Sequence, residues 1–202
     1  MSNVRASKSG LSRDTHKKIQ SKYDKVLALE CLEWLRETAN ESLEDGDYEL
    51  EFDTDGSPGE LYNILRDGCV LARVINSLMP CTIPHKKYAI PSKLAFKHME
   101  LIELFIIGCK EFGVSDHDVF QTCDLYEQQN LPQVLTCIQA LGRKARSKGF
   151  SGIGPKESDE NRRIFSDEQV IQGKQVISLQ MGSNKGASQA GMTFGKQRMI
   201  LD

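Results

Sequence analysis

The acidic stretch around Asp53 holds the nearest approach to a metal-binding motif in the chain. Asp53, Asp55 and Gly56 match part of the loop with which helix–loop–helix proteins bind calcium. Such a loop has glycine at its sixth position and a bidentate acidic ligand at its twelfth. If Gly56 is the sixth residue, the twelfth is Tyr62, which cannot act as that ligand. The spacing therefore predicts a solvated acidic loop without a metal ion.

Two further patterns that could support catalysis are incomplete. The run from Gly149 to Ile153 approaches the G-x-S-x-G turn that exposes a hydrolase serine, but Ile153 replaces the last glycine and no strand pattern precedes it. The chain also lacks a glycine-rich phosphate-binding loop. The histidines are scattered and do not have the spacing of metal ligands; they are His16, His85, His98 and His117. The sequence accordingly predicts a protein without enzymatic activity, cofactor or metal.

The cysteines also give little support to catalysis. They form no C-x-x-C pair and mostly lie among apolar residues, which favours buried free thiols in a reducing cytoplasm over disulfides or zinc ligands. Only Cys109, beside Lys110, has a cationic neighbour that could lower the pKa of a thiol. The six cysteines are Cys31, Cys69, Cys81, Cys109, Cys123 and Cys137.

Charge is distributed unevenly along the 202 residues, although the net charge is only −2. Residues 1–25 carry a net +5, residues 26–142 a net −12 and residues 143–202 a net +5. An acidic body would be repelled by nucleic acid, whereas basic ends suit an acidic protein surface. Merely solvated basic tails remain the plain alternative. We expect no membrane contact, because no apolar run approaches the roughly 20 residues that span a bilayer and the N-terminus is not a signal peptide.

Helical periodicity dominates the middle of the chain, and no segment has the alternation of a strand. From Tyr23 onward, Ala28, Leu32, Leu35 and Ala39 share one helix face. Residues 40–59 are acidic and rich in turn formers, so we expect a loop there. A second helical region covers residues 61–79 and is broken near residues 66–68. Proline residues then bracket an irregular stretch up to residue 91.

Four later helices are marked by capping signals. Ser92 is a candidate cap of a helix that ends at Gly113, and Ser115 is one for a short helix. Asn130, with Pro132 in the first turn, opens the last long helix, and Ser166 caps a short one before Gly173. The apolar faces expected for the two long helices are Ala95, Met99, Ile102, Ile106 and Cys109 in the first, and Val134, Ile138, Leu141 and Ala145 in the second. The sequence predicts an all-α domain between a disordered arm over residues 1–20 and a linker that begins at residue 149.

The segment from Gln175 to Leu201 does not fit a globular core. It opens with a short apolar run and continues with Gly, Ser, Asn, Gln and Ala, which bury too little surface to offset the entropy lost on ordering. The segment has no short repeat, and basic and apolar residues occur in it at irregular intervals. We therefore interpret it as a largely unstructured peptide that docks on a partner.

The string ISLQMGSNKGASQAGMT within this segment resembles the calponin-like repeat of the calponin/transgelin family, which implies binding to actin filaments. The resemblance implies that basic residues pair with acidic actin residues and that apolar residues supply adaptable contact. The residues so assigned are Lys174, Ile177, Leu179, Met181, Lys185, Met192, Lys196 and Arg198. Auxiliary attraction is expected from Lys17, Lys18, Arg162 and Arg163, although acidic residues interrupt the cluster that holds the last two.

Upstream, the order and spacing of residues 10–148 resemble a single calponin-homology domain. The strings that carry this resemblance are YDKVLALECLEWL, LRDGCVLARVINSLMP, AFKHMELIELFIIGCKEFGV and DVFQTCDLYEQQNLPQVLTCIQALGRKA. The resemblance implies a turn at Asp67-Gly68 and a core that includes Trp34, Leu71, Ile75, Phe105, Phe120 and Leu141. One such domain and one repeat give a transgelin-like organisation: an arm over residues 1–22, the domain over 23–148, a linker over 149–173 and the repeat with its tail over 174–202.

Two hypotheses for the function follow. The first is an actin-filament-binding cytoskeletal protein of the cytoplasm that acts through its repeat, with cross-linking of filaments and further cytoskeletal or signalling partners left open. Phosphorylation of Ser183 would add negative charge beside Lys185 and oppose docking on acidic actin. The second is a signalling or scaffold adaptor whose helical domain binds another protein through its acidic face, without contact to actin.

Overall fold

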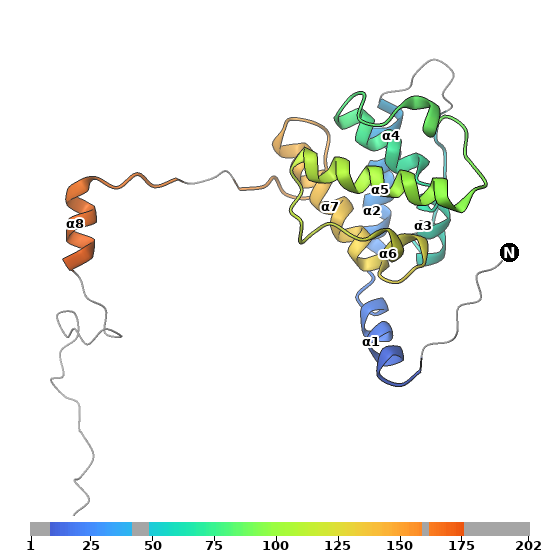
Figure 1. Cartoon of the computed structure of the whole chain (residues 1–202), viewed down its shortest axis with the longest axis horizontal. Helices are drawn as coiled ribbons and strands as arrows, with labels where there is room; N and C mark the ends of the chain where they lie inside the picture. Colours follow the sequence, from blue (N-terminus) through green and yellow to red (C-terminus); the bar gives the residue numbers. More distant parts are fainter. Residues whose placement is uncertain (1–8, 42–48, 159–161, 176–202) are drawn as a thin grey trace, which may run out of the picture. The chain divides into compact units, whose positions relative to one another are not determined.

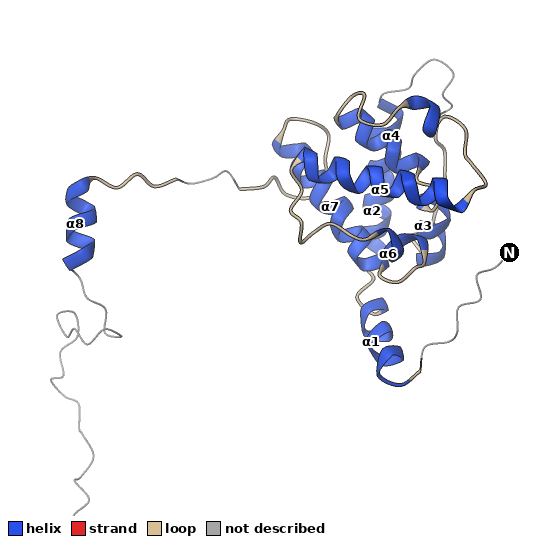
Figure 2. Ribbon diagram, in the orientation of Figure 1, coloured by secondary structure: helices blue, strands red, loops and turns tan. Residues whose placement is uncertain are grey.

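The computed structural model describes residues 9–41, 49–158 and 162–175. It divides the chain into two compact units, Met1–Ser158 and Asp159–Asp202. Within the described ranges the structure is helical and contains no strand (Figure 2), which confirms the all-α prediction. No helix of this part of the chain is long and apolar enough to cross a membrane.

The first unit consists of seven α-helices and one short 3-10 helix among its described residues (Figure 1). Their bounds are α1 Gly10–Gln20, α2 Lys25–Glu41, α3 Pro58–Leu65, α4 Cys69–Leu78, η1 His85–Lys87, α5 Ala95–Phe112, α6 Thr122–Tyr126 and α7 Leu131–Ser147. Helix α2 contacts both α4 and α7, while α5 packs against α4, α6 and α7. The second unit contains α8, Asp167–Gln175.

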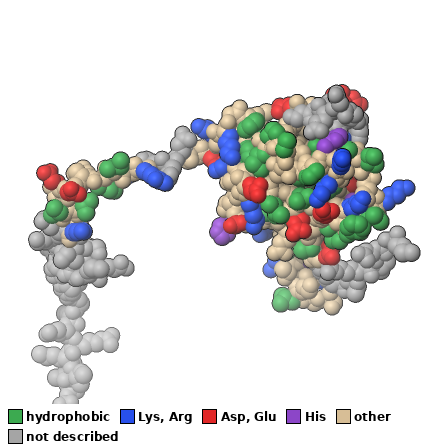
Figure 3. All heavy atoms as spheres, turned by 45° about the horizontal axis from the view of Figure 1, so that its top comes forward, with side chains coloured by type: hydrophobic (Ala, Val, Ile, Leu, Met, Phe, Trp, Pro, Cys, Tyr) green, Lys and Arg blue, Asp and Glu red, His purple; other side chains and the backbone are tan. Residues whose placement is uncertain are grey.

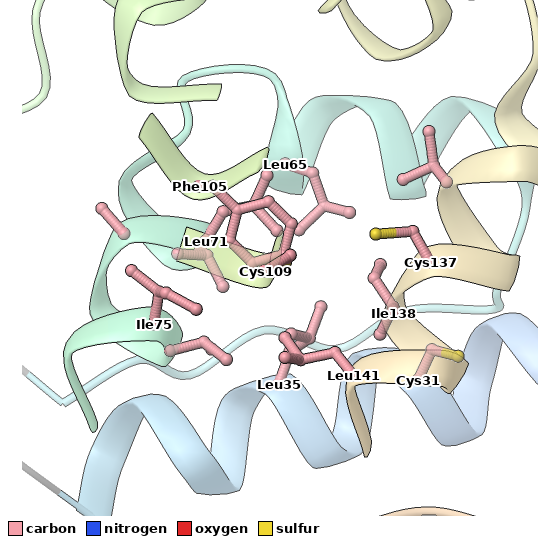
Figure 4. Close-up of a cluster of buried hydrophobic side chains, with 14 of the residues drawn as sticks. Cys31, Leu35, Leu65, Leu71, Ile75, Phe105, Cys109, Cys137, Ile138 and Leu141 are labelled. Atoms are coloured by element: carbon pink, nitrogen blue, oxygen red, sulfur yellow. The ribbon is translucent and has the colours of Figure 1, made fainter. Parts of the chain in front are cut away.

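The core lies where α2, α4, α5 and α7 face one another, and Figure 4 shows side chains from these helices converging there. The predicted faces of α2 and α7 are buried, and so are all six core residues that the family resemblance implied. Helices α4 and α5 pack so closely that only glycine fits at position 108. A Cβ at Gly108 of α5 would lie 2.5 Å from Ile75 Cγ1 of α4. Burial of this apolar surface is the main stabilising contribution to the unit.

The turn between α3 and α4 forms as predicted. Gly68 has a φ of +76°, which favours glycine, and a Cβ there would lie 2.7 Å from Leu101 Cβ. Asp67 accepts a hydrogen bond from Cys69 N at 2.9 Å. At the far end of α5, Gly113 has a φ of +104° and ends the helix, also as predicted.

Four expectations for the helix bounds were wrong. One of them is the stop at Gly173, since α8 continues to Gln175. Residues 10–20 of the expected disordered arm form α1, which contacts α7 and whose Gln20 Nε2 donates to Gln128 O at 3.3 Å. Helix α5 begins at Ala95 rather than after Ser92, whose hydroxyl accepts from Leu94 N in the preceding turn. Ser115 opens a turn rather than a helix, and the short helix α6 follows it at Thr122.

Residues 149–157, here called the C-terminal strap, pack against the domain. Trp34 Nε1 donates to Ser151 O at 3.1 Å, and Ile153 lies against Gly142 of α7. Lys144 pairs with Glu157 at 2.9 Å. The first part of the expected linker is therefore tied to α7 by apolar and polar contacts.

Candidate functional site

Of the eight residues assigned to actin binding, the structure describes one. Lys174 lies in the last turn of α8 and is exposed. A lysine at this end of a helix interacts favourably with the negative end of the helix dipole and leaves its ammonium group in solvent. The other seven residues, and Ser183, lie outside the described residues: Ile177, Leu179, Met181, Lys185, Met192, Lys196 and Arg198.

The auxiliary basic residues fall in both units. Lys17 and Lys18 are exposed neighbours in the last turn of α1, and Arg162 and Arg163 are exposed in the segment before α8. The two pairs belong to different units. Each pair is accessible to an acidic partner.

A groove runs between α1 and the connection from α6 to α7. Its volume is about 440 Å³. Both apolar and polar side chains of α1 form one wall, and polar residues of the α6–α7 region form the other. The lining residues are Leu11, Ser12, Thr15, His16, Ile19, Asp124, Gln129 and Asn130. Because Asp124 and Asn130 also cap the neighbouring helices, we assign the polar wall a structural role.

The acidic residues near Asp53 serve the start of α3. Asp55 Oδ1 accepts from Ser57 N at 2.7 Å, and Glu60 Oε2 accepts from Thr54 Oγ1 at 2.6 Å. The hydrogen bonds from Ser57, together with nearby Lys25, lower the pKa of Asp55 below its ordinary value. Among the described residues no group of three or more His, Cys, Asp or Glu side chains is arranged to hold a metal ion. The loop is thus a helix cap.

Burial keeps the core thiols protonated. It raises the pKa of Cys31 and of Cys69 to about 12, and it raises that of Cys109, which packs beside Cys137, well above its ordinary value. A thiol must ionise to act as a nucleophile, so these cysteines are inert near neutral pH. Lys110 does not activate Cys109, because its ammonium group pairs with Asp116 at 2.8 Å.

Sequence reasoning missed a surface that combines basic and apolar side chains. It consists of Lys86, Ile90, Lys93, Leu94, Phe96 and Lys97, all exposed, and is called the basic–apolar patch below. These residues come from η1, the loop after it and the start of α5. Figure 3 shows blue basic and green apolar side chains interleaved on that side of the domain. The sequence held one sign of this patch. Residues 68–99 contain neither Asp nor Glu, although residues 26–142 as a whole are acidic.

Two family models match the chain, one over the helical domain and one over the C-terminal segment. The model of the calponin homology (CH) domain matches residues 25–147, and that of the calponin family repeat matches residues 177–200. Myophilin of Echinococcus granulosus is 42% identical over 206 residues, which cover 100% of both chains. The chain belongs to the calponin/transgelin family.

Two solved structures are similar to the CH domain of this chain. A structure of Vav1 bound by an allosteric inhibitor matches with a TM-score of 0.50 and 24% identity, over 65% of this chain and 24% of that one. The calponin-homology domain of Rng2 from Schizosaccharomyces pombe matches with a TM-score of 0.45 and 24% identity, over 75% of this chain and 95% of that one. The Vav1 likeness supports the fold alone.

Membership in the calponin/transgelin family fixes the broad class of function. A CH domain followed by a calponin repeat indicates a cytoskeletal, actin-related role. Cytoskeletal domains of the calponin family are typically non-enzymatic. The repeat match also contains seven of the eight residues that the sequence assigned to binding.

Proposed function

We propose that this protein binds actin filaments through its calponin repeat. The observation that carries the proposal is the repeat match over residues 177–200, which follows the CH-domain match over residues 25–147 in the same chain. Lys174 extends the basic character of the repeat into α8, where its side chain is exposed. The proposed binding residues are the eight assigned from the sequence.

The residue types of the repeat suit an acidic, partly apolar surface. Lys185, Lys196 and Arg198 can pair with carboxylates, while Met181 and Met192 are flexible and polarisable and adapt to irregular apolar contacts. A peptide that orders on binding loses conformational entropy, so the affinity of a single repeat is modest. The attraction is partly electrostatic and weakens above about 0.2–0.3 M salt.

Cross-linking requires a second contact besides the repeat. Lys17 and Lys18 on α1 and Arg162 and Arg163 before α8 are exposed basic pairs that could add it. Two weak contacts in one chain reach a higher combined affinity when the geometry lets both engage. We place the protein in the cytoplasm with the actin cytoskeleton, in a muscle or similar contractile setting.

Co-sedimentation with actin filaments tests the proposal. The full chain is compared with residues 1–170 and with a K185E/K196E/R198E variant. A K17E/K18E variant measures how much the N-terminal arm contributes to filament binding. We expect the full chain to pellet and salt to release it, whereas the truncated chain and the repeat variant remain in solution. Equal pelleting of the full and truncated chains would move the binding site to the domain or the arm. Failure of all forms to pellet would remove the actin proposal.

Ser183 is a proposed control point of the same contact. A phosphate adds nearly two negative charges close to Lys185 and opposes docking on an acidic surface. Ser183→Asp should therefore weaken filament binding severalfold, and Ser183→Ala should bind like the parent chain. Equal binding of Ser183→Asp and the parent would remove this regulatory role.

A further inference from the structure

We infer that the basic–apolar patch of the CH domain is a docking surface for an acidic amphipathic segment of a partner protein. The inference concerns the folded domain and stands independently of filament binding by the repeat. It also differs from an adaptor that works through the acidic face of the domain, because the patch is the basic part of an otherwise acidic body.

The apolar side chains of the patch are exposed to solvent. Ile90 is 82% exposed, Phe96 59% and Leu94 50%. The three lie within seven residues of one another, at the loop before α5 and in its first turn. Scattered exposed apolar residues are normal on a protein surface, but clusters rimmed by polar groups often mark binding sites.

Charge sets the patch apart from the surface around it. Residues 26–142 contain eight Lys and Arg against twenty Asp and Glu, and half of those basic residues lie in the short run from Lys86 to Lys97. Lys87 is paired with Glu100 at 2.6 Å. Lys86, Lys93 and Lys97 have no ion-pair partner among the described residues. Three exposed lysines therefore flank the apolar residues in the sequence and can pair with carboxylates of a ligand.

The backbone that carries the patch is firmly held. Asn76 Nδ2 donates to Ile83 O at 2.7 Å and to Tyr88 Oη at 2.9 Å, and Asn76 Oδ1 accepts from Ile83 N at 2.8 Å. Ile83 and Tyr88 are buried, and so is His98, whose Nε2 contacts Ser92 O. A surface fixed in this way loses little entropy when it binds, which favours a preformed docking site.

The apolar side chains and the positive charge of the patch indicate which kind of partner binds it. Leucine-like side chains of a short segment can cover Ile90, Leu94 and Phe96, while its acidic residues meet the lysines. A flat anionic membrane would also attract these lysines, but it would extend over the acidic surface around them and be repelled there. A narrow peptide avoids that repulsion, so a protein segment is the favoured partner.

A fluorescent peptide of leucine and glutamate at helical spacing serves as the probe, with anisotropy measured on the full-length protein at low and moderate salt. We expect saturable binding that salt weakens, and a loss of about tenfold or more in K86E/K93E/K97E, since each lysine faces the charge of the ligand. The variant I90S/F96S should also bind more weakly, since the apolar contact is lost. R13E/K22E/K25E is the matched control because it changes the net charge equally at exposed residues outside the patch, and it should stay within about twofold.

Three results would overturn the inference: no saturable binding of the peptide, equal binding by the patch variants, or equal loss in the matched control. Vesicles of phosphatidylcholine and phosphatidylserine form a separate arm, and tighter patch-dependent binding to them than to the peptide would make the surface a membrane site instead. Actin co-sedimentation of K86E/K93E/K97E separates this inference from the proposed function. That variant should still pellet through its repeat while it no longer binds the peptide.

Discussion

Helix α7 in the domain and helix α8 in the second unit both begin at a polar side chain that caps the first turn. Asn130 Oδ1 accepts from Gln133 N at 3.3 Å, and Ser166 Oγ accepts from Gln169 N at 3.4 Å. In α8 the cap is reciprocal, since Ser166 N donates to Gln169 Oε1 at 3.1 Å. The local signals that start a helix are therefore equally good in the two units.

The surroundings of the two helices differ. Nine residues of α7 are buried, against α2, α5 and the strap. The described side chains of α8 are exposed, including Val170 and Ile171, the latter at 56%. Capping thus suffices to begin a helix, but most helical stability in proteins comes from the packing of an apolar face. We expect α7 to unfold with the whole domain and α8 to unfold independently of it.

The largest effect is expected when one apolar side chain is removed from each helix. Leu141→Ala in α7 should lower the free energy of unfolding by about 2–5 kcal/mol, because it leaves a cavity in the core. Ile171→Ala in α8 should change it by less than about 0.5 kcal/mol, as expected for an exposed site. Urea unfolding followed by the fluorescence of Trp34, the single tryptophan and a buried residue of the domain, measures both. A comparable loss in the two variants would show that α8 packs as part of the domain.

Replacing one glycine in each helix by alanine should have a smaller effect. The substitution should destabilise the domain at Gly142 and stabilise α8 at Gly173. A Cβ at Gly142 would overlap Ile153 Cγ1 and lie 3.1 Å from Ile153 N, whereas a Cβ at Gly173 meets nothing within 4 Å. Gly142→Ala should therefore displace the strap and cost about 1–3 kcal/mol of domain stability, despite the higher helix propensity of alanine. Gly173→Ala should slow hydrogen exchange in α8 by up to about fivefold, since alanine favours the helix by up to about 1 kcal/mol. Unchanged stability of Gly142→Ala would mean that the strap can move without cost.

The sequence predicted those helices best whose polar and apolar faces are distinct. The stripe of α7 was correct because polar residues such as Thr136, Gln139 and Arg143 recur at helical spacing on another face. In α5 the predicted stripe was partly wrong: Ile102 and Cys109 are buried, but Ala95 and Met99 are exposed and Ile106 is only half-buried. The full set of buried α5 residues is His98, Leu101, Ile102, Phe105, Gly108, Cys109 and Phe112. Because apolar residues occur all around α5, periodicity could not select the buried face, and packing against α4, α6 and α7 decided it.

The candidate sites likewise differ in whether they could be predicted from the sequence. The repeat was found as a continuous string, since its residues are neighbours in the sequence. The basic–apolar patch joins η1, a loop and the first turn of α5, and the exposure of Ile90 and Phe96 depends on which neighbours the fold gives them. Only the absence of acidic residues over 68–99 hinted at it. Sequence reasoning therefore identifies linear motifs, while surfaces assembled by the fold require the structure.

The smallest expected effect comes from the two caps themselves. Asn130→Ala should lower the free energy of unfolding of the domain by about 1 kcal/mol, since Gln133 N loses its acceptor at the start of a helix that belongs to the core. Ser166→Ala removes the corresponding acceptor of Gln169 N and should leave the Trp34 unfolding curve unchanged, while hydrogen exchange in α8 becomes faster. A shift of the Trp34 curve by Ser166→Ala would couple α8 to the domain. Absence of faster exchange in α8 would mean that its first turn does not depend on the cap.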